Sequence, residues 1–254
     1  MNRIVGNGPD LALIHGWGLS SAIWQPLLDA LARSCRVHRV DLPGYAGSAC
    51  DSADFAATAR RLLDALPAPE VLCGWSLGAA LAMHAALHAP QRVAGLVLVA
   101  ATPCFVQRDD WRTAQPPELL DGFAASVEQQ AEPTLRRFIA LLCQGDRQAR
   151  SITRGLLAGL RQGPLPTAAA LARGLDWLRT VDLRQSLPMI TVDTLLIHGD
   201  QDPLNPLAAA RWLSARLPRG RLEVFAGAAH APFFADRDRF VDLLDDFCHA
   251  RTAA

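Results

Sequence analysis

The 254-residue sequence contains no lysine, and all 25 of its basic residues are arginine. A pyridoxal Schiff base, a lysine-dependent aldolase and a P-loop nucleotide site each require a lysine amine, so these chemistries are excluded. The sequence also lacks any run of about eighteen apolar residues, which argues against a transmembrane helix. Its first twenty residues hold one arginine and an apolar run broken by His15 and Gly16. We therefore expect a soluble, cytoplasmic protein with no membrane partner.

The sequence also has no net charge. The 25 acidic residues balance the 25 arginines, and the isoelectric point is about 7.0. No global property favours nucleic acid or an anionic membrane as a partner. The six cysteines show no CxxC spacing and no metal-ligand cluster occurs, so we expect free thiols, no metal and no cofactor.

The pentapeptide Gly74-Trp75-Ser76-Leu77-Gly78 has the GxSxG pattern. An apolar run precedes it and a helix-forming stretch follows it, which is the strand, sharp turn and helix that this motif requires. The glycines let the backbone turn sharply and leave the serine hydroxyl exposed above the sheet. Ser76 is therefore the predicted nucleophile.

A serine nucleophile needs a histidine base, and the base needs a carboxylate that fixes its tautomer. Asp202 lies in a polar turn after a buried-type strand, and His230 lies in the loop after the next strand. The chain order Ser76, Asp202, His230 is that of α/β-hydrolases. Asp200 is the alternative acid, although it could simply cap the turn. The other histidines have structural explanations, but two of them, His15 and His198, end strands before glycine and could lie near the site.

Acyl transfer by a serine nucleophile also needs donors for the oxyanion. The segment His15-Gly16-Trp17-Gly18 follows an early strand, at the position where α/β-hydrolases carry one donor. We assign the oxyanion hole to the backbone amides of Trp17 and Leu77. An ordinary strand-ending turn is the alternative explanation of this glycine-rich segment.

Strand-like and helix-like segments alternate at both ends of the chain, which predicts one mostly parallel sheet with helices on both faces. The expected strands are 11–15, 36–40, 70–74, 95–100, 194–198 and 221–225. Between them, helical patterns occupy 116–130, 134–143, 147–160 and 167–178. We expect an α/β-hydrolase core over residues 1–104 and 186–254, with residues 105–185 inserted as a helical cap over the site.

Residues 134–161 contain six arginines but only one acidic residue, Asp146. At 100° per residue, Arg147, Arg150, Arg154 and Arg161 share one helix face, opposite the apolar residues Ile152, Leu156 and Leu160. This basic stripe indicates either a plain solvated face or a docking surface for an acidic or phosphorylated partner.

Five segments together resemble the pimeloyl-acyl-carrier-protein methyl ester carboxylesterase family of biotin biosynthesis. They are His15-Gly16-Trp17-Gly18-Leu19, Gly74-Trp75-Ser76-Leu77-Gly78, Pro103-Cys104-Phe105, Thr180-Val181-Asp182-Leu183-Arg184-Gln185 and Ala228-Ala229-His230-Ala231-Pro232-Phe233. The resemblance spans nearly the whole chain. GxSxG alone is common among hydrolases, whereas the combination of segments is much more specific to one family.

The resemblance implies hydrolysis of a methyl ester on a pimeloyl chain carried by acyl carrier protein. We expect the protein to be a monomer. Arg137, Arg150 and Arg154 match the basic cap positions of the family and would dock the acidic carrier. Trp17 and the apolar stretch Phe138, Ile139, Ala140, Leu141 and Leu142 would line the acyl channel, although helical spacing also fits a plain core.

Two features depart from the family pattern. Few residues precede the first core strand, so the opening antiparallel strands could be stunted or absent, and Pro133 stands where another arginine is expected. The same triad also serves enol-lactonases, broad carboxylesterases and carbon–carbon bond hydrolases. A non-catalytic receptor on this fold is a further alternative, but it normally shows a damaged triad.

Overall fold

The computed structural model describes residues 3–51, 53–67 and 70–252. Within these residues the strands are β1 (Arg3–Val5), β2 (Asp10–Ile14), β3 (Arg36–Val40), β4 (Glu70–Trp75), β5 (Val93–Val99), β6 (Thr194–Gly199) and β7 (Gly220–Phe225). The α-helices are α1 (Leu28–Leu31), α2 (Phe55–Asp64), α3 (Leu77–His88), α4 (Pro117–Val127), α5 (Ala131–Leu142), α6 (Ala149–Leu160), α7 (Ala168–Thr180), α8 (Leu207–Ser214), α9 (Pro232–Ala235) and α10 (Arg237–Thr252). Short 3₁₀ helices occupy Ser21–Leu27, Pro90–Arg92 and Leu187–Met189.

The strands form one twisted sheet in the order β1-β3-β2-β4-β5-β6-β7. Every neighbouring pair is parallel except β1 with β3, whose register pairs Ile4 with His38. The strand order reverses between β2 and β4, because the chain runs outward from β2 to β3 and then returns to the other side of β2. In open α/β sheets, ligands bind at the carboxyl ends of the strands at such a reversal.

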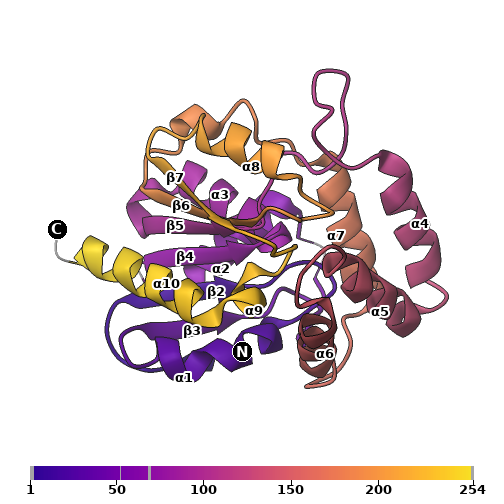
Figure 1. Cartoon of the computed structure of the whole chain (residues 1–254), viewed down its shortest axis with the longest axis horizontal. Coiled ribbons are helices and arrows are strands. Elements are labelled where there is room, and N and C mark those ends of the chain that lie inside the picture. Colours follow the sequence, from indigo (N-terminus) through magenta and orange to yellow (C-terminus); the bar gives the residue numbers. More distant parts are fainter. Residues whose placement is uncertain (1–2, 52, 68–69, 253–254) are drawn as a thin grey trace.

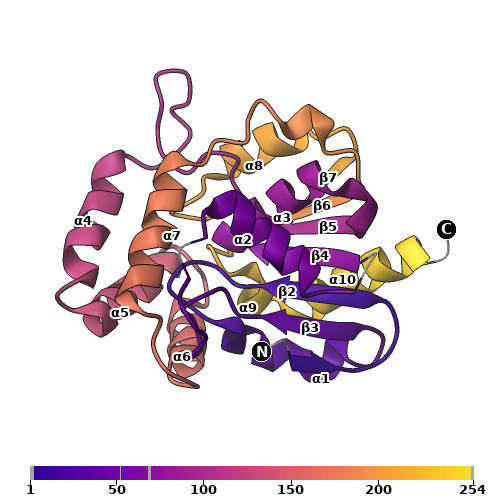
Figure 2. The same cartoon turned by 180° about the vertical axis from the view of Figure 1, so that it is seen from behind.

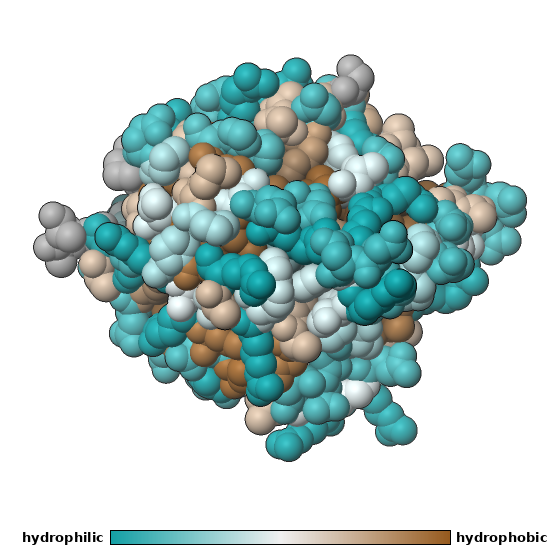
Figure 3. Space-filling view, turned by 90° about the horizontal axis from the view of Figure 1, so that it is seen from above, coloured by the Kyte–Doolittle hydropathy of each residue, from teal (hydrophilic) through white to brown (hydrophobic). Residues whose placement is uncertain are grey.

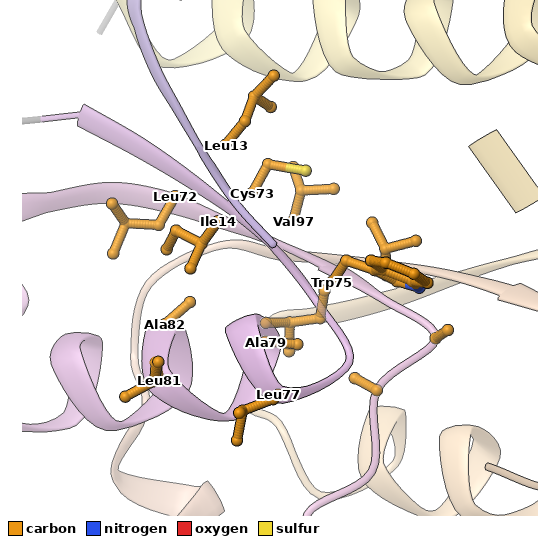
Figure 4. Close-up of a cluster of buried hydrophobic side chains, with 14 of the residues drawn as sticks. Leu13, Ile14, Leu72, Cys73, Trp75, Leu77, Ala79, Leu81, Ala82 and Val97 are labelled. Carbon is orange, nitrogen blue, oxygen red and sulfur yellow. The ribbon is translucent and has the colours of Figure 1, made fainter. Parts of the chain in front are cut away.

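Helices cover both faces of this sheet. Helices α1 and α10 lie in front of it in Figure 1, and α2 and α3 lie in front of it in the reverse view of Figure 2. The central strands β4 and β6 are buried along their whole length, as expected for a parallel sheet covered on both faces. Figure 4 shows Ile14 and Leu72 on the side of the sheet that faces α3, with Leu13 and Cys73 on the opposite side.

Helices α4 to α7 lie together beyond one end of the sheet (Figure 1). The two points where the chain leaves the sheet and returns to it are joined. Cys104 and Asp182 form an antiparallel bridge, and the Leu183 amide donates to the carbonyl of Pro103 at 2.9 Å. The segment that contains α4 to α7 therefore leaves and rejoins the rest of the chain side by side.

The predicted strands are found within one or two residues of their expected bounds, and the α/β-hydrolase architecture is confirmed. The opening antiparallel strand is present but is only three residues long. The predicted helix over 147–160 begins later, at Ala149, because Arg147 belongs to the preceding turn. The ends of the predicted core, residues 1, 2, 253 and 254, lie outside the described residues, as do residues 52, 68 and 69.

The surface seen from above is largely hydrophilic, with apolar residues exposed in separate patches (Figure 3). Among the described residues, no helix combines the length and the apolar character needed to span a bilayer.

One buried acidic residue lies where the parallel strands begin, at the opposite edge of the sheet from the carboxyl ends of the strands. Glu70 begins β4 and is 1% exposed, and within the described part of the chain neither of its carboxylate oxygens has a hydrogen-bond partner. Burial, together with the negative charge of Asp10, raises the pKa of Glu70 to about 8, and the charge of Arg92 only partly opposes this. The protonated form of Glu70 is thus the stable one in the folded protein.

We expect Glu70→Gln to stabilise the protein at alkaline pH. The folded-state pKa of Glu70 lies above the unfolded value of about 4.5. The contribution of Glu70 to folding stability is therefore fully present below pH 4.5 and is lost as the pH rises to about 8. Each pKa unit corresponds to about 1.4 kcal/mol, so the variant should gain a few kcal/mol at pH 9 and almost nothing at pH 4.5. Urea unfolding of both proteins across this range measures the difference. An equal difference at every pH would contradict the buried charge as its cause.

Candidate active site

The turn between β4 and α3 places Ser76 at the reversal of strand order. Ser76 has φ 55° and ψ −114°, a conformation that a residue with a Cβ rarely adopts. The backbone is crowded here. A Cβ on Gly74 would lie 2.3 Å from the carbonyl oxygen of Gly78, and one on Gly78 would lie 2.5 Å from that of Ile14. The glycines of the motif are therefore required by the close approach of β2, β4 and α3.

Asp202 and His230 come together from the loops after β6 and β7. Nδ1 of His230 lies 2.7 Å from Oδ2 of Asp202, and both side chains are fully buried. Burial by itself raises the pKa of Asp202, but the nearby histidines and backbone N–H donors outweigh it, so the pKa is lowered and the carboxylate is ionised. Because Nδ1 donates to Asp202, Nε2 of His230 is free to accept a proton. Among the described residues, this buried Nε2 has no hydrogen-bond partner.

His230 is also tied to the residue before the serine. The indole Nε1 of Trp75 donates to the carbonyl oxygen of His230 at 2.7 Å, and the two rings lie 5.7 Å apart. This long-range contact keeps the His230 backbone next to the Ser76 turn. The tryptophan before the serine was visible in the sequence, but the sequence did not show that its indole would bind the His230 carbonyl.

Asp200, the alternative acid, serves the turn instead. Its Oδ1 accepts from the Gly227 amide at 2.7 Å. Asp202 has the imidazole contact, and its other oxygen accepts from the amides of Leu204 and Asn205, both at 2.9 Å. The structure thus pairs His230 with Asp202 rather than with Asp200.

The predicted oxyanion donors flank Ser76 on two elements. Leu77 is the first residue of α3, and Trp17 follows Gly16, whose Cβ, if present, would lie 3.3 Å from Cβ of Ser76. In the described residues, neither backbone N–H donates to another group. His15 stabilises this turn. Its Nδ1 donates to the Gly16 carbonyl at 2.8 Å, and its Nε2 accepts from the Leu42 amide at 3.0 Å. Burial lowers the pKa of His15, consistent with a neutral ring in this arrangement.

The connection between α5 and α6 holds the His230 loop from the other side. Asp146 is the single acid in the arginine-rich stretch, and its Oδ2 accepts from the Ala229 amide at 2.7 Å. The carbonyl oxygen of Leu142 accepts from the His230 amide at 3.2 Å. Sequence reasoning missed both contacts, although an isolated acid among arginines was the available signal.

Two small cavities reach Ser76. The first is lined by residues that include Thr102, Trp177 and Asn205, and it encloses about 20 Å³. The second encloses about 10 Å³ beneath α4, α5 and α7, and its lining includes Trp17, Phe123 and Phe138. Each has room for about one water molecule. Like Ser76, Phe105 and Leu178 line both cavities.

Two of the six residues predicted to line an acyl channel lie at the second cavity. Trp17 and Phe138 line a cavity at Ser76, and their rings meet edge to face at 4.8 Å. Ile139 and Leu142 are fully buried core residues, Ala140 is exposed, and Leu141 is partly buried against the core. Successive helical residues point about 100° apart, so five consecutive residues cannot all face one cavity. Of the predicted residues, only Trp17 and Phe138 line it.

Of the predicted basic stripe, one arginine lies before the start of helix α6. Arg147 lies before α6, where its amide donates to the Gly227 carbonyl at 3.0 Å. Arg137 on α5 and Arg150 and Arg154 on α6 are exposed, and in the part of the chain that the structure describes none of the three forms an ion pair. The neighbouring Arg136 is different, because it pairs with Glu132.

Comparisons with known proteins agree with this geometry. The family model described as "alpha/beta hydrolase fold" matches residues 11–236. Proteins named pimeloyl-(acyl-carrier protein) methyl ester esterase are similar to this chain. The one from Nitrosomonas europaea is 40% identical over 243 residues, covering 94% of this chain and 96% of the relative. The one from Serratia marcescens is 40% identical over 250 residues, covering 98% and 97%.

Among solved structures, an esterase from Exiguobacterium antarcticum superposes with a TM-score of 0.85 at 24% identity, covering 98% of this chain and 94% of that chain. At that identity the likeness shows the fold alone. Combined with the nearly full-length relatives, the strained serine turn and the paired Asp202 and His230, these findings place the chain in the α/β-hydrolase superfamily, as a member of the pimeloyl-(acyl-carrier protein) methyl ester esterase family.

Proposed function

We propose that this protein is a serine carboxylesterase that hydrolyses the methyl ester of a pimeloyl chain carried by acyl carrier protein, in biotin biosynthesis. The family membership supports the substrate class. The observation that carries the chemistry is the buried 2.7 Å contact between His230 and Asp202, beside a serine in a strained turn. No metal or cofactor enters the proposal.

In the proposed reaction, Nε2 of His230 takes the proton from the Ser76 hydroxyl as its oxygen attacks the ester carbonyl carbon. Asp202 stabilises the imidazolium that forms, and the amides of Trp17 and Leu77 stabilise the oxyanion. The tetrahedral intermediate collapses, and methanol leaves with the proton from His230. A water molecule, deprotonated by His230, then attacks the acyl-serine. The bond to the Ser76 oxygen breaks, this oxygen takes the proton back from His230, and the free carboxylic acid is released.

We assign residues 105–185 to a helical cap on a core formed by residues 1–104 and 186–254. The bridge between Cys104 and Asp182, where the chain leaves and rejoins the core, supports these boundaries. The side chains of Phe123, Phe138 and Leu175 from this segment lie over Ser76. Because the cavities there hold about one water each, entry of a pimeloyl chain requires the cap side chains to move.

Exposed arginines on α5 and α6 provide a docking surface in this proposal. Arg137, Arg150 and Arg154 carry positive charge that no ion pair within the described residues neutralises. An acidic carrier protein with a phosphate on its prosthetic arm is complementary to such a surface. We infer that the protein acts as a monomer toward this partner.

Ser76→Ala should lower kcat on any ester about 10⁴-fold or more, because it removes the attacking oxygen. The thermal midpoint should stay close to that of the parent protein, since Ala retains the Cβ that the turn already holds. Hydrolysis of a chromogenic short-chain ester, followed with thermal unfolding, tests both points. Substantial remaining turnover by a folded variant would show that the nucleophile is another residue.

Asp202→Asn and Asp200→Asn form a matched pair that tests the acid. An amide at position 202 fails to stabilise the imidazolium, so kcat should fall about 10⁴-fold. At position 200 the amide oxygen still accepts from the Gly227 amide, so kcat should change little. The steady-state rate at neutral pH decides between them, and a larger loss for Asp200→Asn would reverse the assignment.

Replacing Arg150 and Arg154 together by alanine should lower kcat/KM for pimeloyl-acyl-carrier-protein methyl ester on the order of tenfold at low salt, because charge steering raises association rates. Activity on a short free ester should not change. Arg60→Ala, an exposed arginine on α2, is the control. Equal rates for the parent protein on carrier-bound and free esters, with no effect of salt, would indicate a general carboxylesterase and a plain solvated stripe.

A further inference from the structure

A second buried histidine, His198, lies beside Asp202, the predicted acid of the site. His198 is next to the end of β6, is 1% exposed, and has Nε2 2.7 Å from the carbonyl oxygen of Asn205. A carbonyl oxygen can only accept, so Nε2 carries the proton and donates. The same nitrogen lies 3.5 Å from Oδ2 of Asp202, beyond normal hydrogen-bond distance. The Asn205 carbonyl is therefore the partner of His198, with the carboxylate as its neighbour.

Asn205 links this histidine to the rest of the site. Its backbone amide donates to Oδ1 of Asp202 at 2.9 Å, and its side-chain amide donates to the Ala100 carbonyl at 2.6 Å. Ala100 follows β5 and has a positive φ of 48°. The loop that carries Asp202 is thus fastened to the ends of two adjacent strands, through His198 on β6 and through Ala100 after β5.

We propose that His198 is a positioning residue for ester hydrolysis, which fixes the Asp202 loop so that one carboxylate oxygen stays on Nδ1 of His230. This inference rests on the proposed function, because it assumes that Asp202 and His230 carry out the reaction. In this proposal His198 acts through Asn205 and Asp202 rather than on the reacting atoms.

The neutral state of His198 is part of this arrangement. The charged or titratable groups that act on it are Asp202 and His230. Burial lowers the pKa of His198, and the field of His230 adds to this, while Asp202 and the Asn205 carbonyl oppose it. A protonated His198 would place a positive charge 3.5 Å from the oxygen that His230 uses. With His198 neutral, the negative charge of Asp202 serves the imidazolium that forms during turnover.

The test compares His198→Phe with His198→Gln on a short chromogenic ester, so that its outcome does not depend on the carrier protein. Phenylalanine keeps a ring but removes the donor to Asn205, whereas glutamine keeps an N–H donor. Active sites are counted by stoichiometric reaction of Ser76 with a phosphonate ester, and kcat is expressed per active site from pH 5 to pH 9. This normalisation separates a mispositioned acid from a loss of folded protein.

We expect His198→Phe to lower kcat per active site between about tenfold and a hundredfold, the range typical of a displaced supporting group. A carboxylate held against an imidazole stabilises its protonated form, so a loosened Asp202 should move the acid limb of the pH–rate profile to lower pH. His198→Gln should recover most of the rate and the original profile. An unchanged kcat and profile per active site in His198→Phe would overturn the proposal, leaving a plain core histidine.

Should His198→Phe fail to fold, Asn205→Ala provides the second measurement. It removes the bond to Ala100, the other fastening of the loop, and the same shift of the acid limb is expected. An unshifted profile in that variant would also contradict the proposal. Failure of the proposed function looks different, because Ser76→Ala would then retain activity or the phosphonate would not react with Ser76 in the parent protein.

Discussion

The close approach of β2, β4 and α3 around Ser76 is the constraint on which the site depends. The serine can hold a φ of 55° only because glycine at positions 74 and 78 lets three backbone segments pass within a distance that a Cβ would block. The buried parallel sheet supplies the rigidity that maintains this strained turn. The same packing brings the Gly16–Trp17 turn against Ser76, so one crowded junction places both the predicted nucleophile and the predicted oxyanion donors.

The histidine and the acid are positioned by a different principle. Both lie on loops, and each loop is fastened by several long-range hydrogen bonds. The His230 loop is held by the Trp75 indole and by Asp146, while the Asp202 loop is held by Asn205 and His198. Because these bonds are buried, an unmade partner would be costly, and the loops have few alternative positions. Asp146 belongs to the helical segment over the site, so this segment supports the core as well as covering it.

Charged groups occur in two places, as a buried carboxylate in the otherwise apolar interior and as exposed arginines on α5 and α6, here called the rim. At the centre, a buried ionised carboxylate is balanced by hydrogen bonds and histidines. At the rim, Arg137, Arg150 and Arg154 are exposed, and within the described residues none of them forms an ion pair. Short-range contacts thus set the chemistry, and longer-range attraction would set the encounter with an acidic carrier.

Much of the fold and the strand–turn–helix that holds Ser76 could be predicted from the sequence, because apolar periodicity and the GxSxG pattern are local properties of the chain. The strand positions, the order of Ser76, Asp202 and His230 and the family resemblance all came from such local patterns. Which residues of 138–142 face the cavity was not readable, since it depends on how α5 is rotated against the core. Arg147 left the predicted stripe because the turn before α6 packs against Gly227. The sequence favoured Asp202 over Asp200, but the contact of Asp202 with His230 and the place of His198 beside it are set by the tertiary structure, because hydrogen bonds between residues distant in sequence determine which side chains meet.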